Sequence, residues 1–149
     1  MQDVLKLWRE ASSGILSTTS VVVEGYPFGS VVPYVTLDSG APVIYISTIS
    51  QHYKNLSADA RTCLTVVEAV ADDPQAGARI SLLADAAPVS AEAVDAVGEA
   101  YFELFPASRQ FAGTHGFQFW VLQPKRIRFI GGFGKIYWIE AEDWAAAAK

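Results

Sequence analysis

Turn signals interrupt this chain at close intervals, and their spacing restricts the fold more than any other feature. Between them lie short apolar stretches that are rich in β-branched and aromatic residues. These stretches cover residues 15–23, 28–37, 43–47, 61–69, 78–89, 117–124, 125–132 and 134–140. Many short strands joined by turns are typical of an antiparallel barrel or sandwich. The alternating βαβαβ order of a parallel dinucleotide-binding sheet is absent.

Helical patterns stand between the predicted strands. Apolar residues recur at helical intervals over 3–12, and we expect Gly14 to end that helix. Ser50 and Ser90 each precede a further helical stretch and are the expected caps. These helices favour a mainly β, α+β barrel with helical plugs over a sandwich. Pro33, inside the second stretch, predicts an edge, a bulge or a bend.

The composition predicts the size of the unit and its partners. With 149 residues, we expect a single domain over residues 1–149. Hydrophobic residues make up 51% of the chain and charged residues 18%, so we expect a homodimer that buries apolar surface. The net charge of -5 argues against nucleic acid and anionic membranes as partners.

The expected location is the cytoplasm. No run of 18 apolar residues is present, and the first ten residues lack the apolar region of a signal peptide. The single cysteine, Cys63, excludes an internal disulfide and fits a reducing compartment. It lies in an apolar run, where a small buried side chain is expected rather than a nucleophile.

Familiar catalytic and metal-binding motifs are missing. Two histidines and one cysteine do not make a closed zinc site, so no metal is predicted. No Gly-x-Ser-x-Gly motif occurs, and no catalytic residue is assigned. The glycines of Gly131–Gly134 lack the Gly-Lys-Ser/Thr ending of a phosphate loop and predict a hairpin turn. Phe133 at its tip and Lys135 beyond it are candidates to face a ligand.

One corner of the chain is unusually rich in hydrogen-bond donors. The apolar stretch 43–46 ends in Ser47, Thr48, Ser50, Gln51 and His52, and the corner contains neither glycine nor proline. A helix N-terminus attracts anions, and hydroxyl donors strengthen that attraction. The corner therefore predicts a site for a phosphate monoester. The alternative is an ordinary capped helix with a solvated polar face, and the residues alone do not decide between the two.

Four blocks of sequence resemble the pyridoxamine-phosphate-oxidase-like split-barrel proteins, and especially their haem-utilisation branch. The blocks are Gly25-Tyr26-Pro27 with Ser30, Ile46-Ser47 with His52, Asn55 and Leu56, the stretch Asp59-Ala60-Arg61, and Gly131–Gly134. They occur in order over Gly14 to Trp144. The third block has alanine where the family usually has proline.

The resemblance implies a split barrel of six to eight antiparallel strands, of the FMN-binding type, that forms a homodimer with two ligand sites at its interface. In flavin-binding members the FMN phosphate lies at the corner, the second strand lies against the isoalloxazine ring, and a polar residue at the position of Arg79 reaches the cofactor. The predicted cofactor-binding residues are Ser30, Val31, Val32, Ser47, Thr48, Ser50, Gln51, His52, Asn55, Arg79 and Lys135.

Departures from the family pattern keep several functions open. Ser30, Val35 and His52 stand where the oxidases carry Arg or Lys, so vitamin B6 oxidation is not expected. Haem-degrading relatives use a C-terminal histidine that this chain lacks, and Gly116 stands where they often carry an acidic residue. His115 is the only imidazole near that point that could replace the axial ligand.

Three functions follow from this pattern. The first is an FMN-dependent oxidoreductase of unknown small-molecule substrate. The first alternative is a haem-binding or haem-utilisation protein that uses the same dimer cleft. The second alternative is a structural dimer without a cofactor.

Overall fold

The computed structural model describes residues 1–70, 72–132 and 134–149. Within them the chain forms one curved antiparallel sheet with helices at its ends. The elements are α1 (Gln2–Glu10), β1 (Ser13–Thr19), β2 (Pro27–Pro33), β3 (Val35–Thr36), β4 (Pro42–Ser47), α2 (Gln51–Ala58), β5 (Arg61–Val67), β6 (Ala78–Pro88), α3 (Val94–Leu104), the 3-10 helix η1 (Pro106–Phe111), β7 (Phe117–Gly131), β8 (Ile136–Glu140) and α4 (Ala141–Ala148).

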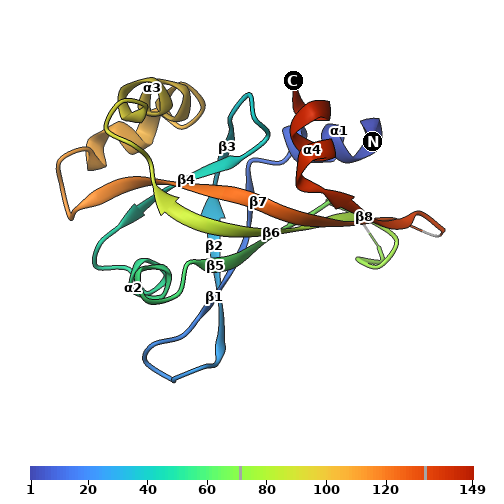
Figure 1. The fold of residues 1–149 in the computed structure, drawn as a ribbon, viewed down its shortest axis with the longest axis horizontal. Coiled ribbons are helices and arrows are strands. Elements are labelled where there is room, and N and C mark those ends of the chain that lie inside the picture. The colour runs from blue at the N-terminus through green and yellow to red at the C-terminus, as the bar shows by residue number, and fades with distance from the viewer. Residues whose placement is uncertain (71, 133) are drawn as a thin grey trace.

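The sheet runs in the order β2-β1-β5-β6-β7-β4-β3, and β8 pairs with β7 off this path. Each of these pairs is antiparallel. Figure 1 shows α1 and α4 side by side near both termini, with α3 beyond the opposite end of the sheet and the β1–β2 hairpin projecting from it. The predicted α+β class with antiparallel strands is confirmed.

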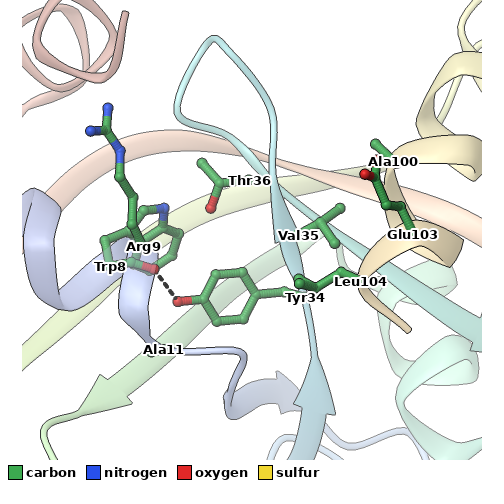
Figure 2. A pocket seen from close by; sticks show the side chains of 9 residues that line it. All are labelled: Trp8, Arg9, Ala11, Tyr34, Val35, Thr36, Ala100, Glu103 and Leu104. Carbon is green, nitrogen blue, oxygen red and sulfur yellow. Dashed lines mark hydrogen bonds between the residues drawn. The ribbon is translucent and has the colours of Figure 1, made fainter. Parts of the chain in front are cut away.

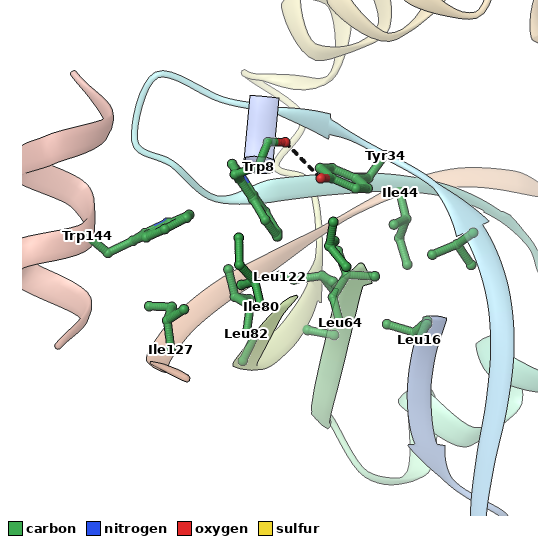
Figure 3. Packing of buried hydrophobic residues seen from close by; sticks show 14 of the residues in the cluster. Trp8, Leu16, Tyr34, Ile44, Leu64, Ile80, Leu82, Leu122, Ile127 and Trp144 are labelled. Carbon is green, nitrogen blue, oxygen red and sulfur yellow. Dashed lines mark hydrogen bonds between the residues drawn. The ribbon is translucent and has the colours of Figure 1, made fainter. Parts of the chain in front are cut away.

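The core lies on the inner face of this sheet, beneath α1 and α4. Leu16, Leu64, Leu82, Leu122 and Ile127 come from four strands and are fully buried there. Trp8 and Trp144 close the core from the two helices, with their rings edge to face at 5.3 Å (Figure 3). Burial of this apolar area is the main term that stabilises the fold.

Two predicted helix boundaries are wrong. The first helix ends at Glu10, and Gly14 lies inside β1. A Cβ atom at Gly14 would lie 2.8 Å from the Thr65 carbonyl oxygen, so close strand packing explains this glycine. Ser90 does not cap α3 through its side chain, because the helix begins at Val94 after a turn and has Ala93 at its N-cap. Only the Ser90 carbonyl contributes, and it accepts the N–H groups of Ala93 and Val94.

Two predicted strand boundaries are also wrong. The stretches 117–124 and 125–132 form one strand, β7, with Pro124 inside it. The pairing with β6 shifts at this point, since Leu83 faces Arg126 and Ala84 faces Pro124. This bulge leaves Lys125 unpaired with β6 and tolerates the proline, which has no N–H to donate. The expected bend at Pro33 is confirmed, because β2 ends there and β3 begins at Val35. β1 ends at Thr19, before the three valines of its predicted stretch.

Candidate functional site

The sheet face opposite the core carries a row of side chains that continues across six strands. We call this face the outer face. Register pairs Val31 with Ile15, Ile15 with Thr65, Thr65 with Ser81, Ser81 with Arg128, and Arg128 with Trp138. These six residues form the central row of the outer face. Each of them directly precedes or follows a buried residue, as expected for a strand with one solvated face. Three apolar members stay exposed: Val31 at 73%, Ile15 at 42% and Trp138 at 44%.

Arg126 and Arg128 bring positive charge to the outer face. Both guanidinium groups lie over the Trp138 indole ring, with Cζ 5.0 Å and 5.2 Å from its centroid. The Arg126 Nε donates to the Glu140 carboxylate at 2.8 Å. Neither arginine is among the residues predicted from the sequence to bind a cofactor. Both arginines contact the ring of Trp138, which lies in the next strand. The sequence alone does not reveal this contact, because it depends on the β7–β8 register.

The predicted residues of β2 separate between the two faces. Val31 belongs to the outer face, whereas Val32 is buried in the core and Ser30 pairs with the buried Leu16. Any contact of Val32 with a ligand on the outer face would therefore use its backbone.

Arg79 and Lys135 are held by different neighbours. Arg79 extends from the outer face of β6, donates to the Gln75 carbonyl at 3.3 Å, and lines a hollow of about 240 Å³ with Asp73, Ile130 and Ile136. Lys135 donates to Asp3 of α1 at 2.9 Å, and this ion pair raises the pKa of Lys135 and lowers the pKa of Asp3. Phe133, the other candidate at this turn, lies outside the described residues.

In the corner between β4 and α2, the hydroxyl groups bind the protein's own backbone. Ser47 Oγ donates to the His115 carbonyl at 2.6 Å, and Thr48 Oγ1 donates to the same oxygen at 3.4 Å. Ser50 Oγ donates to the Ser47 carbonyl at 2.6 Å and accepts from the Tyr53 N–H at 3.4 Å. Ser50 is thus the helix cap, as predicted. The three hydroxyl protons join segments of the chain, which leaves the first helical N–H groups and His52 as the donors for an anion.

Asn55 joins the same helix to the β1–β2 hairpin. It is fully buried, donates to Thr18 Oγ1 at 3.0 Å, and accepts from the backbone N–H of Val21 and from Gln51 Nε2, both at 3.1 Å. All of these groups belong to the protein. In this structure Asn55 and Gln51 hold α2 against β1, and their predicted contacts with a cofactor stay a prediction.

The two histidines lie near this corner and differ in their surroundings. His52 is half-buried, and burial lowers its pKa. The lowered pKa favours the neutral imidazole, which is the form that ligates metals. His115 is exposed and has φ 49°, the only positive φ of a non-glycine residue among those described. Such strain persists only where the surroundings impose it, and here two hydroxyl groups hold the His115 carbonyl.

The backbone at Gly116 accounts for the absence of the acidic residue that haem-degrading relatives often carry at this position. It has φ 65°, and a Cβ atom there would overlap the Thr48 side chain. An acidic side chain at this position is therefore incompatible with the backbone as it stands.

A larger hollow of about 570 Å³ lies between α1, β3 and α3 (Figure 2). Trp8, Tyr34 and Leu104 are among its walls, and Arg9 and Glu103 lie on opposite sides of it. The Tyr34 hydroxyl donates to the Trp8 carbonyl at 2.9 Å, and burial raises the pKa of Tyr34. None of the predicted site residues lines this hollow.

Two further expectations concern metals and membranes. Across residues 1–70, 72–132 and 134–149, no group of three or more His, Cys, Asp or Glu side chains is placed to hold a metal ion. Of the helices in the described part of the chain, none has the length and apolar character needed to cross a membrane. The cytoplasmic location stays a prediction.

Comparison with known proteins finds two similar proteins that are named for haem. The chain is 36% identical over 135 residues to "Non-canonical heme oxygenase HOZ, chloroplastic" of Arabidopsis thaliana, covering 89% of this chain and 40% of that protein. It also superposes on the solved heme binding protein from Mycobacterium smegmatis with a TM-score of 0.88 and 30% identity, covering 97% of this chain and 59% of that one. The chain thus spans only part of both proteins.

A more distant structure identifies the type of fold. A putative pyridoxamine 5'-phosphate oxidase from Listeria innocua matches with a TM-score of 0.68 at 12% identity, over 88% of this chain and 98% of that one. This likeness concerns the fold alone and confirms the predicted split barrel. The profile of the family described as "CREG, beta-barrel" matches residues 5–146. Because that match covers nearly the whole chain, the protein belongs to the CREG beta-barrel family.

Proposed function

We propose that this protein binds haem on the outer face of its sheet, at the interface of a homodimer. The observation that carries the proposal is the similarity, over most of the chain, to one protein named as a heme oxygenase and to another named as heme binding. This supports the haem alternative of the sequence analysis over the FMN-dependent oxidoreductase. The proposal concerns binding, since the chain spans only 40% of the plant oxygenase.

The residues of the outer face fit such a ligand. Haem has a broad apolar ring system and two carboxylates, so it needs apolar surface next to fixed cations. Ile15, Val31 and Trp138 supply exposed apolar side chains, and Arg126 and Arg128 supply the charge. Burial of apolar ring surface contributes affinity, and the cations determine the orientation of the ligand.

An iron ligand is the second requirement. Bound haem would supply an iron centre that needs one or two ligands from the protein. His52 and His115 are the two imidazoles of the chain, and both lie by the β4–α2 corner. In the proposed dimer, the corner of one copy faces the outer face of the other, so that one copy supplies the cations and its partner supplies the imidazole.

A titration with haemin tests the proposal. We expect a saturable Soret band that reaches its endpoint at one haem per chain, with FMN added in parallel as the competing cofactor. Replacement of His52 and of His115 by Ala, one at a time, should shift the Soret band for whichever residue ligates the iron. A protein that gives no saturable change with haemin, or that binds FMN alone, would contradict the proposal.

A further inference from the structure

Arg128 is the one member of the central row that carries a charge. Its Cζ lies 5.2 Å from the centroid of the Trp138 ring in the neighbouring strand. Among the described residues, no carboxylate or carbonyl accepts a hydrogen bond from its guanidinium group. Arg126, two residues earlier on the same face, differs because its Nε donates to Glu140 at 2.8 Å.

This arrangement leaves the N–H donors of Arg128 available to bind a carboxylate. A guanidinium group is planar, and stacking on an aromatic ring occupies its face while its N–H donors remain at the edge. Those donors match both oxygens of a carboxylate in a bidentate pair. Arg126 lies over the same indole, and its ion pair with Glu140 fixes the second cation close to the first.

The rest of the central row extends away from Arg128 in a way that suits a flat apolar ring. Ser81 and Thr65 are small and partly buried, and Ile15 and Val31 follow them with exposed apolar side chains. Arg128 on β7 and Ile15 on β1 are separated by three strand spacings, or about 14 Å, which is roughly the width of a porphyrin. The row thus places a cation at one end and apolar surface at the other.

We infer that Arg128, held over the Trp138 ring, binds a carboxylate of haem and so determines how the haem ring lies on the outer face. The inference rests on the proposed function and adds to it the ligand group and the residue that recognises it. Trp138 acts as a positioning residue that supports the guanidinium group, and Arg126 lies over the same indole ring.

The experiment compares haemin with its dimethyl ester, in which both carboxylates are blocked, delivered in the same detergent micelles. Wild type should prefer haemin by at least about tenfold, because a charged hydrogen bond contributes that much. Arg128→Met should lose this preference and bind the ester as wild type does. Arg109→Met is the matched control, since Arg109 also stacks on an aromatic ring, Phe102, at 5.0 Å and pairs with Glu99, yet lies outside the outer face.

Variants of Trp138 separate positioning from folding. Trp138→Phe keeps an aromatic platform and should retain the preference for haemin, whereas Trp138→Leu should lose most of it. Thermal melting of each variant without ligand shows whether the fold is intact. Equal binding of haemin and ester by wild type, or an undiminished preference in Arg128→Met, would overturn the inference alone. A wild type that binds neither compound would instead overturn the proposed function.

Discussion

At the scale of single residues, Gly116 offers the sharpest test of the packing between the β4–α2 corner and the segment that leads into β7. Gly116 and Gly113 both have positive φ, at 65° and 74°, but only Gly116 has a neighbour, Thr48, where a Cβ atom would lie. Gly113→Ala therefore measures the cost of the backbone conformation alone, about 1 kcal/mol. Gly116→Ala should cost about 1–3 kcal/mol more, because it also forces Thr48 to move. Urea unfolding of both variants measures the difference, and equal losses of stability would contradict the overlap with Thr48.

His52 gives a second prediction at this scale, which concerns pH. Burial lowers the pKa of His52, so the unfolded chain binds its proton more readily than the folded protein does. This contribution to stability is therefore fully present above the ordinary histidine pKa of about 6.5 and is lost as pH falls below it. The free energy of unfolding of wild type should drop more between pH 7.5 and 5.5 than that of His52→Gln. An equal drop in both proteins would mean that His52 titrates normally.

At the scale of elements, the sequence predicted most strands and the Ser50 cap, because those features follow from local patterns of side chains. It missed the single strand β7, because Pro124 usually ends a strand and only the bulge opposite Leu83 and Ala84 accommodates it. The phosphate site at the corner hydroxyls stays a prediction. The backbone partner of Ser47 and Thr48 is the His115 carbonyl, which is 68 residues from Ser47 and could not be found without the fold.

Asn55 shows how the same corner is held together, and it can be tested. Its amide serves Thr18, Val21 and Gln51 in a fully buried position. Asn55→Ala should lower the free energy of unfolding by about 2–4 kcal/mol, because it leaves the Val21 N–H and the Thr18 hydroxyl without their partner. Ser57→Ala on the same helix removes only an exposed bond to the Tyr53 carbonyl and should cost less than about 1 kcal/mol. Similar losses of unfolding free energy in the two variants would show that the hydrogen bonds of Asn55 do not hold the corner together.

At the scale of the whole molecule, the central row and its neighbours leave one sheet face both apolar and charged. Val31, Ile15, Leu83 and Trp138 are exposed on it, beside Arg126 and Arg128. A chain that is 51% hydrophobic buries its inner face under α1 and α4, but in a single copy these outer side chains stay exposed among the residues that the structure describes. A second copy would cover them, and the haem proposal needs that copy to supply the histidine of the opposite corner.

The oligomeric state therefore tests both ideas, with two variants that differ only in where they place a charge. Val31 and Leu104 are both exposed, at 73% and 57%, but Val31 lies on the outer face and Leu104 lies at the end of α3, beside the hollow next to α1. Sedimentation equilibrium at low micromolar concentration should give a dimeric mass for wild type, since obligate interfaces bury more than about 2,000 Å². Val31→Lys should shift that mass toward the monomer, because it buries an unpaired ammonium group at the interface. Leu104→Lys should remain dimeric, because Leu104 belongs neither to the outer face nor to the β4–α2 corner. A monomeric wild type would remove the dimer, and with it the shared haem site, while a haemin titration of the same sample would show whether one copy binds haem alone.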